Sequence, residues 1–381
     1  MKKIIIMFIS CLLLFNFATV RADDLSIESL SAILIDSDSG QVLFEKNSHE
    51  MLPPASITKI MTMLITMEEI NKGNIKLTDE ATISELAADM GGSQLYLEYT
   101  EKRSIEDLLK GVAVESANDA AVALSEHIAG DYQLFIQMMN DRASELGMKD
   151  TKFQNANGLP AEEHYTSAHD IALMSRELLK YPEIHNYMTI WMTDITVGKN
   201  NDKVRTISNT NKLLRRDNRV DGLKTGYTDD AGYCLAATAK EGSMRLVSVI
   251  LNAPSSNERF DEAMKLLNYG FSQYKKENVV DSNEAMGEII VNKGDIDKIQ
   301  LVTKEGYGQL LPKNETKEFE QEINIPDNIN APIKKGDKIG ELIVKEKGKE
   351  VKKIDLLADQ DVEKITFFGL FNKLYKDFLV F

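Results

Sequence analysis

A serine and a lysine lie three residues apart in the segment Ser56-Ile-Thr-Lys59. On a helix this spacing places a hydroxyl and an amine on one face, about one turn from each other. A serine hydroxyl is a weak nucleophile until a base removes its proton, and a lysine partly removed from water can be that base. The pair alone is a weak signal, because Ser272-Gln-Tyr-Lys275 has the same spacing.

Two further fragments make the pair at Ser56 specific. Ser116-Ala-Asn118 supplies a second hydroxyl and a carboxamide. Lys224-Thr-Gly226 supplies an amine and a hydroxyl beside a glycine, within a run that predicts a strand. Taken in this order, S-x-x-K, S-x-N and K-T-G are the signature of penicillin-recognising serine enzymes. The set predicts acyl transfer with Ser56 as the nucleophile.

The chain resembles the low-molecular-mass penicillin-binding proteins, the serine-type D-alanyl-D-alanine carboxypeptidases (peptidase S11-like). The resemblance spans nearly the whole chain, and its most specific segments are Pro54-Ala-Ser-Ile-Thr-Lys-Ile-Met61, Glu115-Ser-Ala-Asn-Asp-Ala-Ala-Val122 and Asp221-Gly-Leu-Lys-Thr-Gly-Tyr-Thr228. It implies removal of the terminal D-alanine from peptidoglycan pentapeptides through an acyl-enzyme. It also implies covalent binding of penicillin and other β-lactam antibiotics.

The resemblance assigns roles to individual residues. Ser56 would attack the carbonyl between the two terminal D-alanines, Lys59 would be the general base, and Ser116 would relay a proton to the leaving D-alanine. The backbone N–H groups of Ser56 and Tyr227 would form the oxyanion hole. The residues expected to bind substrate are Asn118, Lys224, Thr225, Gly226, Tyr227 and Arg259.

Two of these assignments are open, and so are the roles of two histidines. Tyr227 follows K-T-G where some relatives have histidine, which leaves the role of its side chain undefined. Arg259 is as well explained by a surface arginine on a helix as by a contact with the substrate carboxylate. His164 and His169 lie in or near an Asn/Gly/Pro-rich loop and could shape the cleft, although a polar role in the loop is the simpler interpretation.

Other activities on the same fold are the main alternatives. A β-lactamase of class A needs a deacylating glutamate in an E-x-x-L-N pattern, and the sequence has no such pattern. A D,D-endopeptidase shares the first chemical step, so sequence does not separate it from a carboxypeptidase. A non-catalytic peptidoglycan-binding protein is disfavoured by the intact catalytic set.

Composition and charge exclude other classes of function. The net charge of −15 repels phosphate backbones, so no nucleic-acid partner is expected. The five histidines form no H-E-x-x-H pattern and there is no C-x-x-C, so neither a metal nor another cofactor is expected.

The elements that must hold these residues predict an α+β fold. Residues 31–36 and 41–45 form a predicted hairpin, and a helical stretch runs from Ala55 to about Ile70. Residues 80–190 are mostly helical with a loop at 153–168, and strands return after residue 206. The resemblance specifies a penicillin-binding/β-lactamase-like transpeptidase domain, an antiparallel sheet flanked by helices with a helical subdomain.

Domain limits follow from shifts in composition. Residues 1–22 have two lysines, an apolar run and a small-residue cleavage pattern, so we expect an export signal. The catalytic domain is expected at 23–277 and a small β-rich domain at 284–356, where short β-type runs alternate with turns. Residues 362–381 place their aromatic side chains on one face of a predicted amphipathic helix.

These ends predict the location of the protein. An exported chain with a terminal amphipathic helix is expected at the outer face of the cytoplasmic membrane or in the cell wall, or in the periplasm where there is one. Its partners would be the peptidoglycan stem peptide ending in D-Ala-D-Ala, β-lactams and the membrane surface. Cleavage of the signal would leave Cys234 as the sole cysteine, which we interpret as a small apolar filler.

Overall fold

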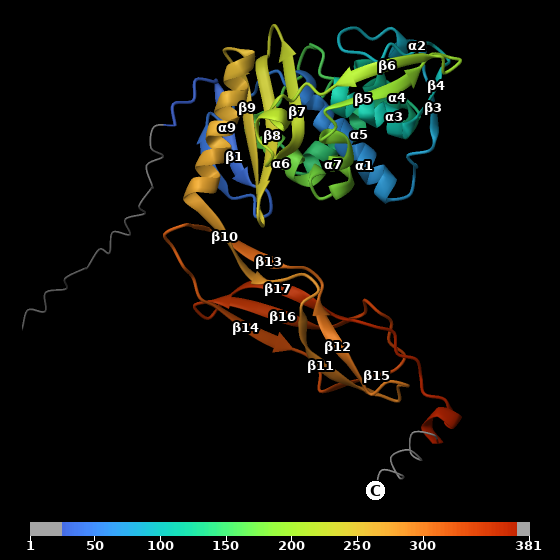
Figure 1. Ribbon diagram of the computed structural model, residues 1–381, viewed down its shortest axis with the longest axis vertical. Helices are drawn as coiled ribbons and strands as arrows, with labels where there is room; N and C mark the ends of the chain where they lie inside the picture. The colour runs from blue at the N-terminus through green and yellow to red at the C-terminus, as the bar shows by residue number, and fades with distance from the viewer. Residues whose placement is uncertain (1–24, 372–381) are drawn as a thin grey trace, which may run out of the picture.

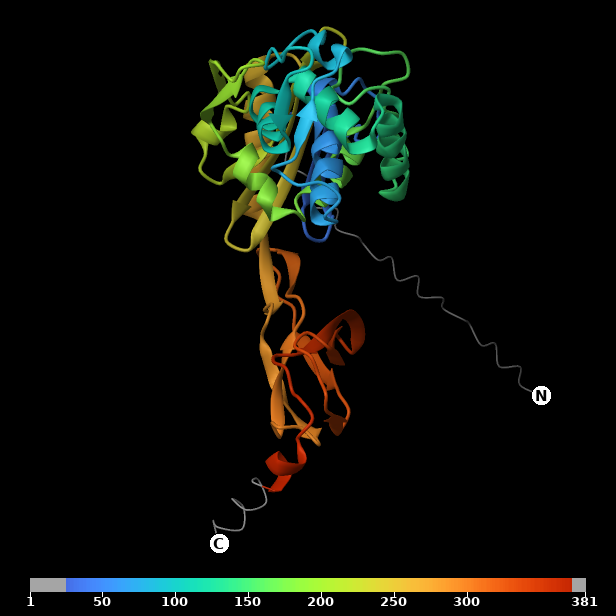
Figure 2. The same ribbon diagram turned by 90° about the vertical axis from the view of Figure 1, so that its right-hand side faces the viewer.

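The computed structural model describes residues 25–371 in two parts that follow one another along the chain (Figure 1). The larger part is a sheet with helices on both faces, and the smaller part consists of strands and extends away from it (Figure 2). The expected export signal, residues 1–22, and residues 372–381 of the expected tail helix lie outside the described residues. The arrangement confirms the predicted α+β class.

The central sheet of the larger part is antiparallel, with the strand order β2-β1-β9-β8-β7. Its strands are β1 (Ser31–Asp36), β2 (Val42–Lys46), β7 (Val220–Thr228), β8 (Gly232–Glu241) and β9 (Met244–Ala253). The predicted hairpin is present, since β1 pairs with β2. Because β1 also pairs with β9, segments from both ends of this part meet in one sheet.

The central sheet is buried on both faces. Successive side chains of a strand point to opposite faces, so Ile33 and Ile35 share a core with the inserted helices, whereas Ala32 and Leu34 share a core with the last helix, α9. Figure 1 shows α9 on one face of the sheet and α6 on the other. A continuous apolar run such as β1 is therefore a strand covered on both sides.

The helices between β2 and β7 carry most of the site. Several begin at a serine or aspartate whose side chain accepts a backbone N–H of the first turn, for example Ser104 and Ser167. In chain order the helices of the larger part are η1 (Ala55–Thr58), α1 (Lys59–Asn71), α2 (Glu85–Ala88), α3 (Ile105–Lys110), η2 (Gly111–Glu115), α4 (Asn118–Ala129), α5 (Tyr132–Glu145), α6 (Ala168–Leu178), η3 (Pro182–Ile184), α7 (His185–Met188), α8 (Leu213–Arg216) and α9 (Ser256–Gln273).

Two short hairpins complete the larger part. In the first, β3 (Glu80–Thr82) pairs with β4 (Lys102–Ser104). In the second, β5 (Met192–Val197) pairs with β6 (Lys203–Ser208). The chain then turns from β6 through residues 209–211 toward β7, which brings Thr210 beside the strand that carries the K-T-G residues.

The smaller part is built around a six-stranded sheet with the order β14-β16-β17-β12-β11-β15, and a two-stranded ribbon β10-β13 joins it to α9. Its buried core contains aliphatic side chains such as Ile299, Leu342 and Leu356. Lys276 on β10 forms an ion pair with Asp38 of the larger part. The strands are β10 (Tyr274–Val280), β11 (Ala285–Asn292), β12 (Lys298–Thr303), β13 (Tyr307–Pro312), β14 (Phe319–Asn324), β15 (Asn328–Asn330), β16 (Lys338–Glu346) and β17 (Lys349–Ala358).

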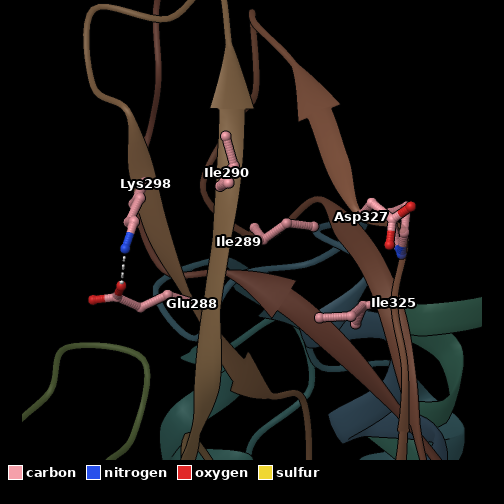
Figure 3. Close-up of a pocket in the computed structure, with 7 residues that line it drawn as sticks. Glu288, Ile289, Ile290, Lys298, Ile325 and Asp327 are labelled. Atoms are coloured by element: carbon pink, nitrogen blue, oxygen red, sulfur yellow. Dashed lines mark hydrogen bonds and ion pairs between the residues drawn. The ribbon is translucent and has the colours of Figure 1, made fainter.

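A cavity of about 440 Å³ opens in the smaller part (Figure 3). Isoleucine side chains of β11 and of the segment after β14 line it, with an ion pair between Glu288 and Lys298 at one side. No residue with a predicted catalytic role lines this cavity, so the search for the reaction site stays in the larger part.

The described chain ends in a helical turn at residues 367–371. Phe367 and Phe368 are 80% and 79% exposed there, and Phe371 is 62% exposed, which is unusual for aromatic side chains. Across residues 25–371 no helix is long and apolar enough to span a membrane.

Candidate active site

Ser56 and Lys59 lie on the same side of the chain, where the short helix η1 continues into α1. The Lys59 ammonium nitrogen Nζ is 3.1 Å from Ser56 Oγ. Ser56 is half-buried and Lys59 is fully buried. The entry to this helix is conformationally unusual, because Ala55 has a φ of +47°. The structure thus brings together the hydroxyl and amine whose spacing suggested a nucleophile and its base.

The Lys59 amine has two further partners, both oxygen acceptors. Nζ donates to Asn118 Oδ1 at 2.7 Å and to the backbone carbonyl of Asn157 at 2.6 Å. Burial holds the pKa of Lys59 well below its ordinary value, the charge of Lys224 lowers it further, and Asp119 opposes the shift. Burial therefore disfavours the charged form of the amine beside Ser56.

Ser116 and Asn118 flank the point where η2 ends and α4 begins. Ser116 has a φ of +64°, a left-handed conformation that turns the chain between the two helices. Asn118 Nδ2 donates to the carbonyl of Gly91 at 2.6 Å, which fixes the amide with its oxygen toward Lys59. Ser116 Oγ is buried and has no hydrogen-bond partner among the described residues. A buried hydroxyl without a partner is a candidate for contact with substrate.

Lys224, Thr225 and Gly226 lie on β7, next to η1. Lys224 is 1% exposed, and burial together with the neighbouring Arg259 charge lowers its pKa to about 7, against the opposing effect of Glu115. Thr225 donates from Oγ1 to Thr210 Oγ1 at 2.6 Å. The structure therefore provides a buried amine and a hydroxyl side by side on the strand.

Gly226 allows β7 to approach the nucleophile closely. A Cβ at this position would lie 3.0 Å from Ala55 Cβ and 3.1 Å from the Ser56 nitrogen. Any larger residue would have to push the strand away from η1. Tyr227, the next residue, points outward. It is 51% exposed, its hydroxyl donates to Asp229, and its ring lies tilted against Tyr233 with the centroids 4.6 Å apart.

Arg259 is buried, so the interpretation as a surface arginine is wrong. The side chain is 8% exposed, and its NH1 group donates to the carbonyls of Gly226 at 2.9 Å and Cys234 at 3.2 Å. Arg259 thus ties α9 to β7 and β8 behind the K-T-G segment. Cys234 is fully buried in β8, as expected of a small apolar filler.

Sequence reasoning missed the part played by the loop at residues 153–168. Its Asn157 carbonyl is a partner of Lys59, and its Gly158 has a φ of +86°. A Cβ on Gly158 would lie 1.9 Å from the carbonyl oxygen of Ala55, so the loop backbone rests directly on η1. The Asn-Gly pair at 157–158 signalled a turn, but a backbone carbonyl carries no sequence signal for its partner.

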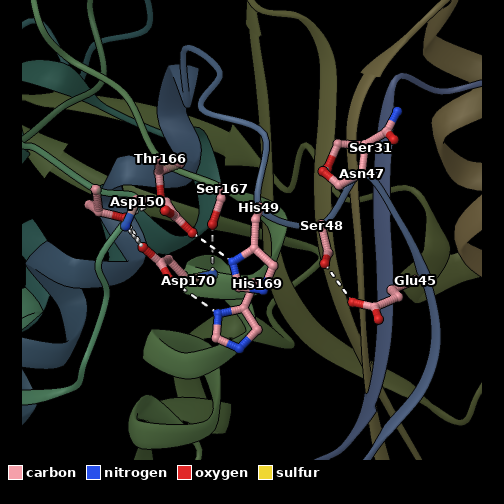
Figure 4. Close-up of polar contacts among 11 residues, drawn as sticks. Ser31, Glu45, Asn47, Ser48, His49, Asp150, Thr166, Ser167, His169 and Asp170 are labelled. Atoms are coloured by element: carbon pink, nitrogen blue, oxygen red, sulfur yellow. Dashed lines mark hydrogen bonds and ion pairs between the residues drawn. The ribbon is translucent and has the colours of Figure 1, made fainter.

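A polar cluster anchors this loop to the segment before η1 (Figure 4). Asp170 accepts hydrogen bonds from the backbone of Asp150 and the hydroxyl of Thr151, both at 2.8 Å. His49 contacts Asp150 at 2.7 Å and stacks on His169 with ring centroids 4.4 Å apart. These contacts hold both ends of the loop, so its middle is fixed over Lys59.

The geometry supports acyl transfer through Ser56. The Ser56 hydroxyl contacts a buried amine of lowered pKa. The Ser116 hydroxyl has no partner in the part of the chain that the structure describes, and the buried Lys224 lies on the neighbouring strand β7. These are the parts of a nucleophile activated by a lysine, with a separate site for an anionic group of the substrate.

Known proteins resemble the chain along most of its length. Residues 18–255 match the D-alanyl-D-alanine carboxypeptidase family model, and residues 274–364 match the C-terminal domain of penicillin-binding protein 5. The D-alanyl-D-alanine carboxypeptidase DacF of Bacillus subtilis is 42% identical over 362 residues, 95% of this chain and 92% of that protein. The carboxypeptidase DacC of Escherichia coli is 35% identical over 353 residues, 90% of this chain and 86% of that protein.

A solved structure has the same fold. Penicillin-binding protein 5 of Haemophilus influenzae is 32% identical, with a TM-score of 0.67, and the match covers 89% of this chain and 98% of that one. The fold and the family expected from the three motifs are both confirmed. The chain therefore belongs to the D-alanyl-D-alanine carboxypeptidase family of serine peptidases.

Proposed function

We propose that this serine-type carboxypeptidase removes the terminal D-alanine from peptidoglycan pentapeptides, with Ser56 as the nucleophile. The observation that carries the assignment is the environment of Lys59, whose buried Nζ lies between Ser56 Oγ and two oxygen acceptors. A peptide ending in D-Ala-D-Ala fits the site chemically, because it presents a carbonyl for attack and a carboxylate one residue away.

The three partners of Lys59 suit a general base. A neutral amine has two N–H groups and one lone pair. Asn118 Oδ1 and the Asn157 carbonyl can only accept, so they take the two N–H groups. The lone pair then faces Ser56 Oγ and takes its proton as the hydroxyl attacks. Asn118 and Asn157 would therefore orient the base, and burial lowers the pKa of Lys59, which favours release of its proton.

The remaining steps use residues around this pair. The tetrahedral oxyanion would accept hydrogen bonds from the backbone N–H groups of Ser56 and Tyr227. Ser116, whose hydroxyl has no partner among the described residues, would carry the proton from Lys59 to the leaving amine of D-alanine. Water then attacks the acyl-enzyme, releasing the shortened peptide and returning the proton to Ser56.

The substrate carboxylate would bind at β7. Lys224 is buried on β7 and the Thr225 hydroxyl lies beside Thr210, and Gly226, close to η1, would let the peptide lie edge-on against the strand. Arg259 contributes through its charge from behind the strand. Penicillin would occupy the same groups, because its carboxylate and strained amide match the carboxylate and scissile bond of the peptide.

One experiment tests this assignment, with the serine of the second S-x-x-K segment as its control. Mature protein without residues 1–22 is incubated with labelled penicillin and with a pentapeptide ending in D-Ala-D-Ala. Ser56→Ala is expected to abolish both the covalent adduct and D-alanine release. Ser272→Ala removes the second S-x-x-K serine, exposed on α9, and both reactions are expected to persist. An adduct that survives in Ser56→Ala refutes the assignment.

The same experiment separates the related activities. Rapid turnover of penicillin would indicate a β-lactamase, and release of cross-linked peptides without D-alanine would indicate an endopeptidase. Incubation with intact peptidoglycan, followed by mass analysis of the peptides, distinguishes the two kinds of D,D-peptidase.

Our proposal for the cellular setting rests on the two ends of the chain. Residues 1–22 would direct export, 23–277 would form the catalytic domain, and 284–356 the β-rich domain. Of the expected tail at 362–381, Val362 is buried in the β-rich part, and the residues from 367 onward would lie on the outer face of the cytoplasmic membrane. The exposed phenylalanines at 367–371 support this assignment, because they offer an apolar surface at the far end of the molecule from the active site (Figure 1).

A further inference from the structure

The peptide unit between Ala55 and Ser56 is held on its carbonyl side. Thr58 Oγ1 donates to the Ala55 carbonyl oxygen at 2.9 Å. The backbone of Gly158 packs against the same oxygen, and Gly226 lies close to the Ser56 nitrogen. This peptide unit carries the Ser56 N–H, one of the two groups proposed to stabilise the oxyanion.

His164 contacts Thr58, the residue whose hydroxyl donates to the Ala55 carbonyl. Its Nε2 is 2.9 Å from Thr58 Oγ1, and its Nδ1 accepts a hydrogen bond from the backbone N–H of Gln154, also at 2.9 Å. His164 and Thr58 are both buried. The ring therefore joins the loop at 153–168 to the first turn of the nucleophile helix.

The hydrogen bonds that link Gln154, His164, Thr58 and Ala55 all run in one consistent direction from donor to acceptor. The N–H of Gln154 can only donate, so Nδ1 of His164 carries no proton and Nε2 does. The Nε2–H then donates to Thr58 Oγ1, which leaves the threonine proton for the Ala55 carbonyl. Burial lowers the pKa of His164 to about 4, which keeps the ring in this neutral form at neutral pH.

The planarity of the peptide bond links this series of hydrogen bonds to the reaction. The carbonyl of Ala55 and the N–H of Ser56 belong to one rigid plane and point in opposite directions. Fixing the direction of the carbonyl therefore fixes the direction of the N–H. The left-handed φ of Ala55, +47°, is strained for this residue, so the plane needs external contacts to keep its orientation.

We propose that His164 is a positioning residue that, through Thr58, orients the Ser56 N–H of the oxyanion hole. The inference rests on the proposed function, in which Ser56 is the nucleophile. It differs from a purely structural role in what it predicts. Loss of the Nε2 donor should slow formation of the tetrahedral intermediate more than it weakens substrate binding or the fold.

Two substitutions of His164 separate its two hydrogen bonds. In His164→Asn the side-chain oxygen can take the place of Nδ1 and still accept from Gln154, but nothing reaches Thr58. In His164→Gln the side-chain nitrogen can take the place of Nε2 and still donate to Thr58. His127→Asn controls for loss of a histidine elsewhere in the larger part, because His127 lies in the last turn of α4, outside the loop and the cluster that anchors it.

The measurements are the second-order rate of acylation by labelled penicillin, kcat and KM for D-alanine release, and the midpoint of thermal unfolding. His164→Asn is expected to lower acylation and kcat roughly 10- to 100-fold, less than full loss of an oxyanion donor, with KM within about twofold of wild type. His164→Gln should acylate several-fold faster than His164→Asn, and His127→Asn should react like wild type. A folded His164→Asn protein that acylates at the wild-type rate overturns the proposal.

A second variant, Thr58→Val, tests the same contacts whether or not His164→Asn folds, and combining it with a folded His164→Asn protein tests whether both act through one chain of contacts. Thr58→Val retains the shape of the side chain and removes the hydroxyl without touching the loop. It should slow acylation as much as His164→Asn, and the double variant should be no slower than either single variant, because both break one chain of contacts. Losses that multiply in the double variant show independent effects and refute the link.

The Ser56→Ala control distinguishes failure of this inference from failure of the proposed function. If Ser56→Ala still forms the adduct, the nucleophile is wrong and the oxyanion argument fails with it. If Ser56→Ala forms no adduct while His164→Asn and Thr58→Val react normally, the nucleophile stands and only the role of His164 is refuted.

Discussion

Adding one methyl group at Gly158, by the substitution Gly158→Ala, tests how closely the loop at 153–168 packs against η1. A Cβ there would lie 1.9 Å from the Ala55 oxygen, 2.3 Å from its carbonyl carbon and 2.9 Å from the Ser56 nitrogen. These are backbone atoms, so they cannot rotate away as a flexible side chain would. In Gly158→Ala either the loop lifts from η1 or the Ala55–Ser56 peptide moves.

The magnitude follows from two separate costs. Alanine at a left-handed φ costs about 1–2 kcal/mol, and crowding in a packed region adds about 1–3 kcal/mol. The free energy of unfolding should therefore fall by roughly 2–5 kcal/mol in Gly158→Ala. A shift of about 1 Å in reacting groups can cost 100-fold in rate, so acylation should fall roughly 100-fold or more.

Gly147 is a matched control for the conformational cost. It has a φ of +75°, and a Cβ there would meet nothing within 4 Å. Gly147→Ala should lose only the 1–2 kcal/mol of the left-handed conformation, with normal acylation. Urea denaturation gives the two stabilities, and labelled penicillin gives the two acylation rates. If Gly158→Ala matches Gly147→Ala in both its free energy of unfolding and its acylation rate, the loop does not constrain Ser56 and the reasoning is refuted.

Three further predictions concern pH, Arg259 and the tail. Lys224 must be cationic to bind a carboxylate, and burial lowers its pKa to about 7, so kcat/KM should fall as pH rises through that value. Lys224→Arg should remove this fall in kcat/KM, and a pH profile that the variant leaves unchanged contradicts the assignment. Arg259→Met should move this fall in kcat/KM to higher pH, because it removes a positive charge next to Lys224. Urea unfolding should show a loss of about 3–6 kcal/mol from two hydrogen bonds of a charged donor, whereas wild-type stability would contradict a structural role of Arg259. A deletion after Ile365 spares the buried Val362 and its pairing with Ile333. It should abolish pelleting of the protein with lipid vesicles and leave D-alanine release intact. Continued pelleting would exclude the membrane anchor.

The local part of the site could be predicted from the sequence because its determinants are local. A hydroxyl and an amine three residues apart share a helix face wherever the helix forms, and Lys59 does contact Ser56. The order of the three motifs then identified the family, and short apolar runs separated by turn residues identified the strands. The segment Ser272–Lys275 shows the limit: the same spacing there spans the end of α9 and the start of β10.

Only the tertiary structure decided what surrounds these residues. The partners of Lys59 include the Asn157 backbone carbonyl, and every residue has such a carbonyl, so no residue type could indicate it. Arg259 and His164 look like ordinary polar residues in sequence, and their roles depend on burial against β7 and against Thr58. Burial also sets the lowered pKa values of the two lysines, because desolvation depends on what packs around a group and not on its neighbours in the chain.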